Sequence, residues 1–207
     1  TTGLAQLRLE APGVAGRGDL VVLRSYSPVA TIGGARVLDP LPQKRRPRSS
    51  AAERVDALRT DDLRTVAVAW ILEAGAGGLS AARLAARLTL PAADVPALLG
   101  DDPEVRRLDT DPPHFVSRAA LSDLAAQTER QLAAFHKENP LRAGMSREEL
   151  RRRLFGRTPP AVFEAVLAAL AAEGALRILP DVIARADHAV VLSPAEEEAR
   201  LALLEAA

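Results

Sequence analysis

The sequence contains no cysteine, which excludes disulfides, thiol nucleophiles and zinc sites built on thiolates. It also lacks any hydrophobic run approaching the ~18 residues of a membrane span, and its first residues do not resemble a secretory leader. Neither sign of charge is in excess, because 27 basic residues are matched by 27 acidic ones. We therefore expect a cytoplasmic protein with no membrane contact and without the basic excess that is usual in duplex-DNA binders.

The patterns that carry catalysis or hold metals are missing as well. No phosphate-cradling G-x-x-x-x-G-K-[ST] loop occurs, and the glycine-rich stretch 13–18 has neither its spacing nor a following helix. The three histidines are scattered and form no H-x-x-x-H pair. These absences predict a chain with no catalytic residue and no cofactor or metal of its own.

The first 40 residues favour extended structure. Three β-rich runs, Ala5–Glu10, Asp19–Arg24 and Val29–Leu38, are present, and a Gly-Gly pair inside the third predicts a bulge or a sharp bend. Three strands cannot close a barrel and leave unpaired edges. No initiator methionine precedes the first residue. We therefore expect residues 1–40 to be the last strands of a larger β-barrel domain.

Residues 41–58 form a basic, proline-rich linker. Lys44, Arg45 and Arg46 follow one another directly and repel one another. Two interpretations are open: a solvated connector, or a basic strap that touches an RNA backbone.

From residue 59 the pattern becomes helical and repeats itself. Gly78-Leu-Ser corresponds to Gly144-Met-Ser 66 residues later, and each is followed by two leucines at the same spacing. Three helices followed by a hairpin is the order of a winged helix, so the repeat predicts tandem winged-helix modules. The predicted fold is mainly α with small β elements: a winged helix over 59–118, a connecting helix over 119–138, a second winged helix over 139–192 and the first helix of a further module over 193–207.

Helix boundaries are predicted from capping residues. Ser80, Asp94, Ser146 and Thr158 are each placed to cap the helix that follows. Between the modules, apolar residues at helical spacing predict one long amphipathic helix that joins them.

The expected recognition helices argue against base readout. Residues 94–100 and 161–173 contain no lysine or arginine, whereas a helix that reads the major groove carries cations or amides. We therefore interpret the modules as spacers or protein-contact units. Positive charge gathers instead on the helix and turn before the second recognition helix, at Arg147, Arg151, Arg152, Arg153 and Arg157. This cluster is either a solvated face with intrahelical pairs or a patch that contacts the backbone of structured RNA.

Two segments resemble a known family. Residues 26–40, YSPVATIGGARVLDP, resemble the end of the third β-domain of bacterial selenocysteine-specific elongation factors, and residues 135–150, FHKENPLRAGMSREEL, look like that family's junction between its first two winged helices. The resemblance covers essentially the whole chain. It implies a rigid arm between a body that binds GTP, magnesium and selenocysteyl-tRNA and a distant end that binds the mRNA hairpin recoding UGA on the ribosome.

The resemblance carries no catalytic residue onto this chain. It adds Arg24 and Arg36 as candidate contacts to the tRNA backbone, because the third β-domain of such factors faces the acceptor and T-stem region. The full set of candidate RNA-backbone contacts is Arg24, Arg36, Lys44, Arg45, Arg46, Arg151, Arg153 and Arg157. The alternative hypothesis is a transcriptional regulator with tandem winged helices, which would bind duplex DNA with a strong salt dependence.

Overall fold

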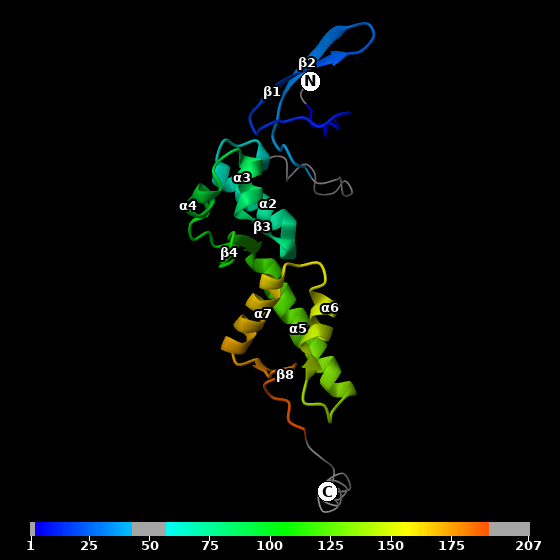
Figure 1. The fold of residues 1–207 in the computed structure, drawn as a ribbon, viewed down its shortest axis with the longest axis vertical. Helices are drawn as coiled ribbons and strands as arrows, with labels where there is room; N and C mark the ends of the chain where they lie inside the picture. Colours follow the sequence, from blue (N-terminus) through cyan, green and yellow to red (C-terminus); the bar gives the residue numbers. More distant parts are fainter. Residues whose placement is uncertain (1–2, 43–56, 191–207) are drawn as a thin grey trace, which may run out of the picture. The chain divides into compact units, whose positions relative to one another are not determined.

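A computed structural model describes residues 3–42 and 57–190 of the chain. The chain divides into two compact units, residues 1–115 and 116–207, which are considered separately below (Figure 1). Lys44, Arg45 and Arg46 and the expected helix over 193–207 lie outside the described residues. In the part of the chain that is described, no helix is long and apolar enough to cross a membrane.

The first unit begins with an antiparallel hairpin of β1 (Leu20–Ser25) and β2 (Ala30–Arg36). Leu23 pairs with Gly33 but Arg24 pairs with Thr31, so Ile32 is an extra residue on β2. This bulge lies beside the Gly-Gly pair and confirms the prediction drawn from it. The predicted strand Ala5–Glu10 is wrong, because this segment has no strand assignment and the described sheet of the hairpin contains only β1 and β2.

A winged helix follows the hairpin in the same unit. Its first helix ends at Gly75, whose φ of 56° is in the left-handed region that favours glycine. The strands form one sheet in the order β3-β5-β4. The elements are α2 (Leu63–Ala74), the 3-10 turn Gly75–Gly77, β3 (Leu79–Ser80), α3 (Ala81–Leu88), the 3-10 turn Ala92–Asp94, α4 (Val95–Leu99), β4 (Val105–Leu108) and β5 (His114–Ser117).

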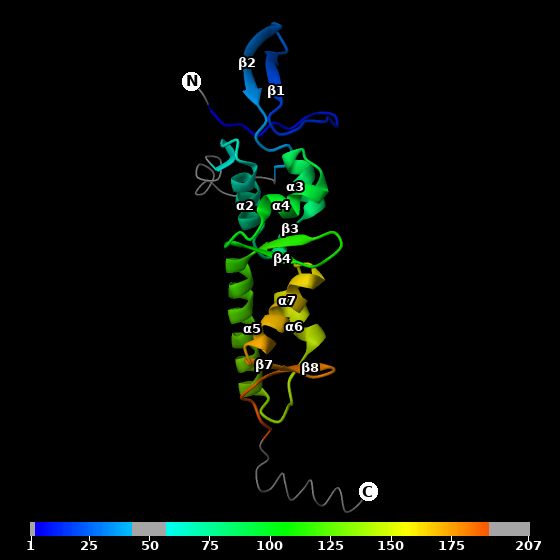
Figure 2. The same cartoon turned by 90° about the vertical axis from the view of Figure 1, so that its left-hand side faces the viewer.

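The second unit repeats this order. Its strands form a sheet in the order β6-β8-β7, of which β7 and β8 are labelled in Figure 2. The elements are α5 (Arg118–Glu138), β6 (Met145–Ser146), α6 (Arg147–Leu154), α7 (Pro160–Ala172), β7 (Leu176–Ile178) and β8 (Val182–Arg185). The predicted fold class, mainly α with small β elements, is confirmed.

The two-residue strands β3 and β6 were not predicted. Each is the first strand of its three-stranded sheet and pairs with the last strand of its own module. Two residues are too few to show the alternation that identifies a strand in a sequence. Their existence depends on a partner strand that lies more than 30 residues later in each unit.

The long helix is a part of the second winged helix. The sequence predicted a connector over 119–138, but α5 packs against α6, α7 and β8 and contributes Leu124, Thr128, Leu132 and Phe135 to their core (Figures 1 and 2). The amphipathic stripe was recognised correctly, yet its partner was not, because a stripe does not say which core it enters. α5 therefore corresponds to α2 of the first module.

The repeated leucines have the predicted role. Leu84 and Leu88 on α3 are buried, as is Leu150 on α6, while Leu154 is half-buried. Buried leucines four residues apart lie on one face of a helix, which is what the repeat required. Each module thus builds its own core around the same pair of positions.

The repeated glycines are needed for two different reasons. Gly78 has a φ of 57°, a conformation that side chains disfavour. Gly144 does not have such a φ, but a Cβ added to it would lie 2.6 Å from the carbonyl oxygen of Ile183 on β8. The first glycine serves a turn, and the second allows two backbones to approach closely.

Capping agrees with the sequence at Ser80, whose hydroxyl accepts a hydrogen bond from the backbone N–H of Arg83. Asp62 caps α2 in the same way, accepting from the N–H groups of Arg64 and Thr65. The Thr65 hydroxyl and the Arg64 N–H lower the pKa of Asp62.

The other three predicted caps are wrong. Asp94 has helical dihedral angles at the end of a 3-10 turn, and its side chain makes no capping bond. Ser146 makes none either, and the first backbone N–H of α6 donates instead to the carbonyl oxygen of Asp181. The hydroxyl of Thr158 donates back to the carbonyl of Phe155 rather than capping α7.

A pair of stacked histidine rings lies where β8 ends. The rings of His136 on α5 and His188 are 3.6 Å apart between centroids and 21° from parallel. Nε2 of His136 accepts from the N–H of Arg185, and Nε2 of His188 donates to the carbonyl of Arg142. Burial lowers the pKa of His136, and the neighbouring His188 and Arg185 lower it further, while Asp187 opposes them.

The second unit should therefore lose stability as the pH falls. Below the ordinary histidine pKa of about 6.5 the unfolded chain takes up a proton at His136, whereas the folded chain does so only at a lower pH. The loss for one proton cannot exceed about 1.4 kcal/mol per pH unit. Urea unfolding followed by circular dichroism at about pH 7.5 and 5.5 measures this loss of unfolding free energy. Both pH values lie above the range in which carboxylates titrate. His136→Gln keeps an acceptor for Arg185 and should flatten the dependence; equal or greater wild-type stability at the lower pH contradicts this.

Candidate nucleic-acid interface

The hairpin carries the first two candidate arginines. Arg24 lies on β1 next to the bulge and is exposed, and the described residues offer it no ion-pair partner. Arg36 at the end of β2 is ion-paired with Asp61, with 2.9 Å between Nη2 and Oδ1. Both side chains of that pair are mostly exposed, so the pair is weak. Arg36 is thus already engaged within its own unit, and Arg24 is not.

Among the described residues of the first unit, the most deeply buried charged side chain is that of Arg87 on α3. Its side chain is 3% exposed, and it forms an ion pair through two nitrogens with both oxygens of Asp39, which is 12% exposed. The guanidinium also lies 4.0 Å from the ring centroid of Trp70 on α2. Asp39 comes directly after the hairpin, so this cluster joins the β-segment to the winged helix.

A second arginine ties the same two parts together. The guanidinium of Arg17 donates to the carbonyl oxygens of Leu38, Leu58 and Thr60, the last two at 2.8 and 2.7 Å. Its backbone N–H donates to the hydroxyl of Thr89 after α3. Burial lowers the pKa of Arg17, with a smaller effect from Arg36, but a guanidinium stays charged. Arg17 therefore acts as a fixed cross-link of backbone segments rather than as a free cation.

The roles of Arg87, Asp39 and Arg17 were not predicted from the sequence. Arg87 and Arg153 occupy equivalent positions of the repeat, yet Arg87 is buried against Asp39 and Arg153 is exposed. Spacing within a helix is the same in both cases and cannot separate them. The difference comes from a carboxylate 48 residues earlier that only the tertiary structure brings into contact.

The arginine cluster of the second unit divides into paired and unpaired members. Arg147 is ion-paired with Glu164 on α7 and lies 5.2 Å from the ring centroid of Phe163. Arg153 is ion-paired with Glu149, one helical turn earlier, at 2.5 Å. Two members of the cluster therefore form ion pairs, one of them within α6, as the solvated-face alternative expects, while contact with RNA stays a prediction. The members that have no ion-pair partner among the described residues are Arg151, Arg152 and Arg157, and all three are exposed.

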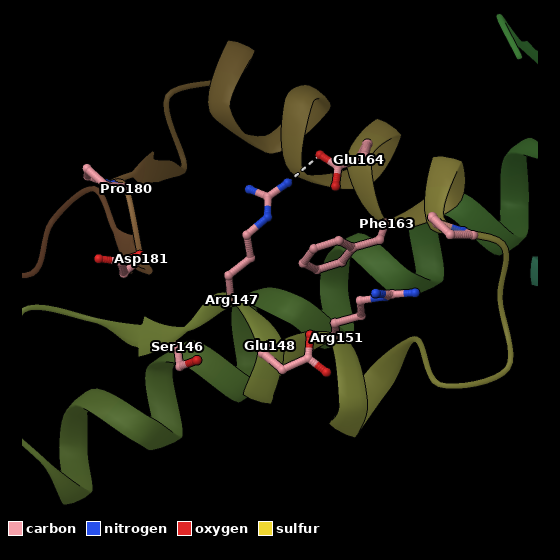
Figure 3. Close-up of a pocket in the computed structure, with 9 residues that line it drawn as sticks. Ser146, Arg147, Glu148, Arg151, Phe163, Glu164, Pro180 and Asp181 are labelled. Atoms are coloured by element: carbon pink, nitrogen blue, oxygen red, sulfur yellow. Dashed lines mark hydrogen bonds and ion pairs between the residues drawn. The ribbon is translucent and has the colours of Figure 1, made fainter.

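A cavity of about 350 Å³ opens beside this cluster (Figure 3). It lies between the start of α6, the start of α7 and the turn that joins β7 to β8. Arg147 points toward Glu164 across it, while Arg151 points away from that pair (Figure 3). The lining residues are Ser146, Arg147, Glu148, Arg151, Pro160, Phe163, Glu164, Pro180 and Asp181.

The family resemblance assigns GTP and magnesium to the body of such factors. The sequence has no phosphate-cradling loop. Among residues 3–42 and 57–190, no group of three or more histidines, aspartates or glutamates is placed to hold a metal ion. We derive no chemical step through either group.

Comparison with known proteins identifies relatives for both units. Residues 1–44 match the family model of the β-barrel domain of selenocysteine-specific elongation factor, and residues 130–184 match the winged-helix model of elongation factor SelB. A selenocysteine-specific elongation factor from Desulfomicrobium baculatum is 30% identical over 152 residues, which are 72% of this chain and 24% of the relative. The chain thus spans about a quarter of that relative, and the resemblance drawn from its two sequence segments is confirmed.

Proposed function

Because the chain belongs to the SelB family of selenocysteine-specific elongation factors, we propose that it is the non-catalytic arm of such a factor. The factor would deliver selenocysteyl-tRNA to the ribosome in the cytoplasm at recoded UGA codons. The arm would hold the part that binds the mRNA hairpin at a set distance from the body that binds tRNA, GTP and magnesium.

The observation that carries this proposal is the buried pair of Arg87 and Asp39. An arm transmits position only when its parts are fixed to one another, and a linker alone would not do this. Here the end of the β-segment is held on α3 by an ion pair that is almost fully removed from water. Arg17 adds hydrogen bonds to three carbonyl groups on both sides of the junction. The first unit therefore has the contacts of a rigid joint.

The composition of α4 and α7 supports an arm rather than a gene regulator. Neither helix carries an arginine, lysine, asparagine or glutamine that could reach a base edge. Glu164 on α7 would repel the phosphates of a duplex that approached this helix. The DNA-binding alternative is not favoured by the family matches either.

The rigidity of the joint can be measured by the distance between two spin labels. Because the sequence has no cysteine, Thr31→Cys on β2 and Arg106→Cys on β4 introduce unique labelling positions, both exposed. Double electron–electron resonance on the full 207-residue chain should give a narrow distance distribution. Asp39→Asn with Arg87→Gln should broaden it. Asp61→Asn is the matched control, since it removes only the exposed pair with Arg36 and should leave the distribution narrow.

A wild-type distribution as broad as that of the Asp39/Arg87 variant would overturn the rigid arm. In a full-length factor, the same double substitution should lower UGA recoding while GTP hydrolysis in solution stays unchanged. Loss of both activities together would instead show general misfolding.

A further inference from the structure

We propose that Arg151, Arg152 and Arg157 of the second winged helix form a contact surface for the phosphate backbone of a folded RNA. We call these three residues the α6 arginine patch. The inference rests on the proposed function in one respect: the chain works among ribosomal and transfer RNAs. It goes further by assigning one surface of the arm to direct RNA contact.

These arginines differ from their neighbours in having no ion-pair partner among the described residues. α6 and the following turn carry five arginines, of which Arg147 and Arg153 are held by Glu164 and Glu149. The α6 arginine patch has no such partner among the described residues, although Glu148 is on the same helix. Three guanidinium groups and one unpaired carboxylate leave a local excess of positive charge in a chain whose net charge is zero.

The chemistry of the groups also fits phosphate. An exposed guanidinium is weakly hydrated and presents a planar fork of donors that matches two phosphate oxygens. Arg151 and Arg152 are adjacent on α6, and Arg157 follows in the turn before α7. Exposed guanidinium groups on one helix and the turn after it can each neutralise a phosphate, and the resulting release of counterions is the main source of such affinity.

The cavity shown in Figure 3 is not the anion site itself. Three carboxylates, Glu148, Glu164 and Asp181, line it against two guanidinium groups, so a phosphate inside would meet net repulsion. The ring of Phe163 is almost completely buried and offers no face for a stacked base. Arg152 and Arg157 do not line this cavity, so the α6 arginine patch extends beyond it.

The absence of base-reading side chains on α7 decides between RNA and duplex DNA. A winged helix that binds duplex DNA inserts its third helix into the major groove, and α7 has only Glu164 as a charged residue. Folded RNA is recognised mostly through shape and phosphate contacts, which need no base readout. The α6 arginine patch with an acidic α7 therefore fits RNA.

The test compares two variants with the same net charge. Arg151→Gln, Arg152→Gln and Arg157→Gln remove the α6 arginine patch. Arg83→Gln, Arg106→Gln and Arg130→Gln remove three exposed arginines elsewhere. The probes are a labelled RNA hairpin with a stem of about 16 base pairs and a DNA duplex of the same sequence. Fluorescence anisotropy with the full chain measures the Kd for each probe at salt concentrations from about 50 to 200 mM.

We expect the patch variant to bind the RNA hairpin at least about tenfold more weakly at low salt, with a slope of log K against log salt that is smaller by roughly 2 to 3. The control variant should change the Kd less than about twofold, and circular dichroism should show both variants folded. Equal weakening in both variants, no RNA binding by the wild type at low salt, or tighter binding to the DNA duplex would each overturn the proposal. None of these results would affect the spin-label distances, so failure here is distinguishable from failure of the arm.

Discussion

Replacing Arg87 with alanine is expected to destabilise the first unit by about 3–5 kcal/mol, the range for removing one partner of a buried ion pair. The substitution leaves the Asp39 carboxylate, 12% exposed, without the two donors that compensate its burial. It also removes the cation from the face of Trp70 and opens a gap between α2 and α3. The main cost is therefore the uncompensated charge and not the lost attraction.

Urea unfolding followed by tryptophan fluorescence measures this loss directly. Trp70 is the single tryptophan of the chain and is buried in the first unit, so its signal reports on that unit. Arg36→Ala is the matched control, because it breaks only the exposed pair with Asp61 in the same unit, at a cost of about 0.2–1 kcal/mol. Similar losses in the two variants would contradict a special role for Arg87.

A double-mutant cycle separates the pair from the packing. Arg87→Met alone should be costly, whereas Arg87→Met combined with Asp39→Leu should recover most of the stability, since apolar pairs often replace buried ion pairs without loss. No recovery in the double variant would show that Arg87 matters through its other contacts, such as the one with Trp70.

The second large effect is expected at the repeated leucines. Leu84→Ala and Leu150→Ala each remove a fully buried side chain, and each should destabilise its own unit by about 2–5 kcal/mol. The cost combines the lost transfer of the side chain from water with the cavity left behind. Both leucines have the same place in the repeat, so the two losses of unfolding free energy should be similar in size, but each should affect a different unit.

Two signals tell the locations apart. Leu84→Ala should move the tryptophan transition to lower urea concentration. Leu150→Ala should leave that transition near its wild-type midpoint and shift an earlier transition seen by circular dichroism, to which the helices of both units contribute. A tryptophan transition that moves as far with Leu150→Ala as with Leu84→Ala would contradict separate cores. Val162→Ala removes a smaller buried side chain, so it should shift the same transition as Leu150→Ala with a smaller loss of unfolding free energy.

The elements with a local cause could be predicted from the sequence. The bulge in β2 follows from adjacent glycines, the cap of α3 from Ser80, and the tandem modules from a repeat of leucines at fixed spacing. These features depend on residues within one or two turns of each other, where backbone sterics and helical geometry decide the outcome. The family resemblance was also visible, since it rested on two short segments that the comparisons confirmed.

The partners of charged and polar groups could not be predicted. Ser146 and Ser80 look alike in the repeat, and the first backbone N–H of each following helix donates to a carbonyl in the turn before the last strand of its module, yet only the Ser80 hydroxyl caps its helix. Likewise, the sequence marked Arg36, Arg151 and Arg153 as equal candidates for RNA. The structure shows Arg36 and Arg153 in ion pairs and leaves Arg151 exposed.

The sequence by itself determined the family, the mainly α fold and the two-fold repeat, since each is written in short-range patterns of apolar and turn-forming residues. The tertiary structure alone decided that α5 enters the second core, that Asp39 holds Arg87, and which arginines are free to meet a phosphate. The physical reason is distance along the chain. Burial and ion pairing depend on groups tens of residues apart, and their contact is created by folding itself.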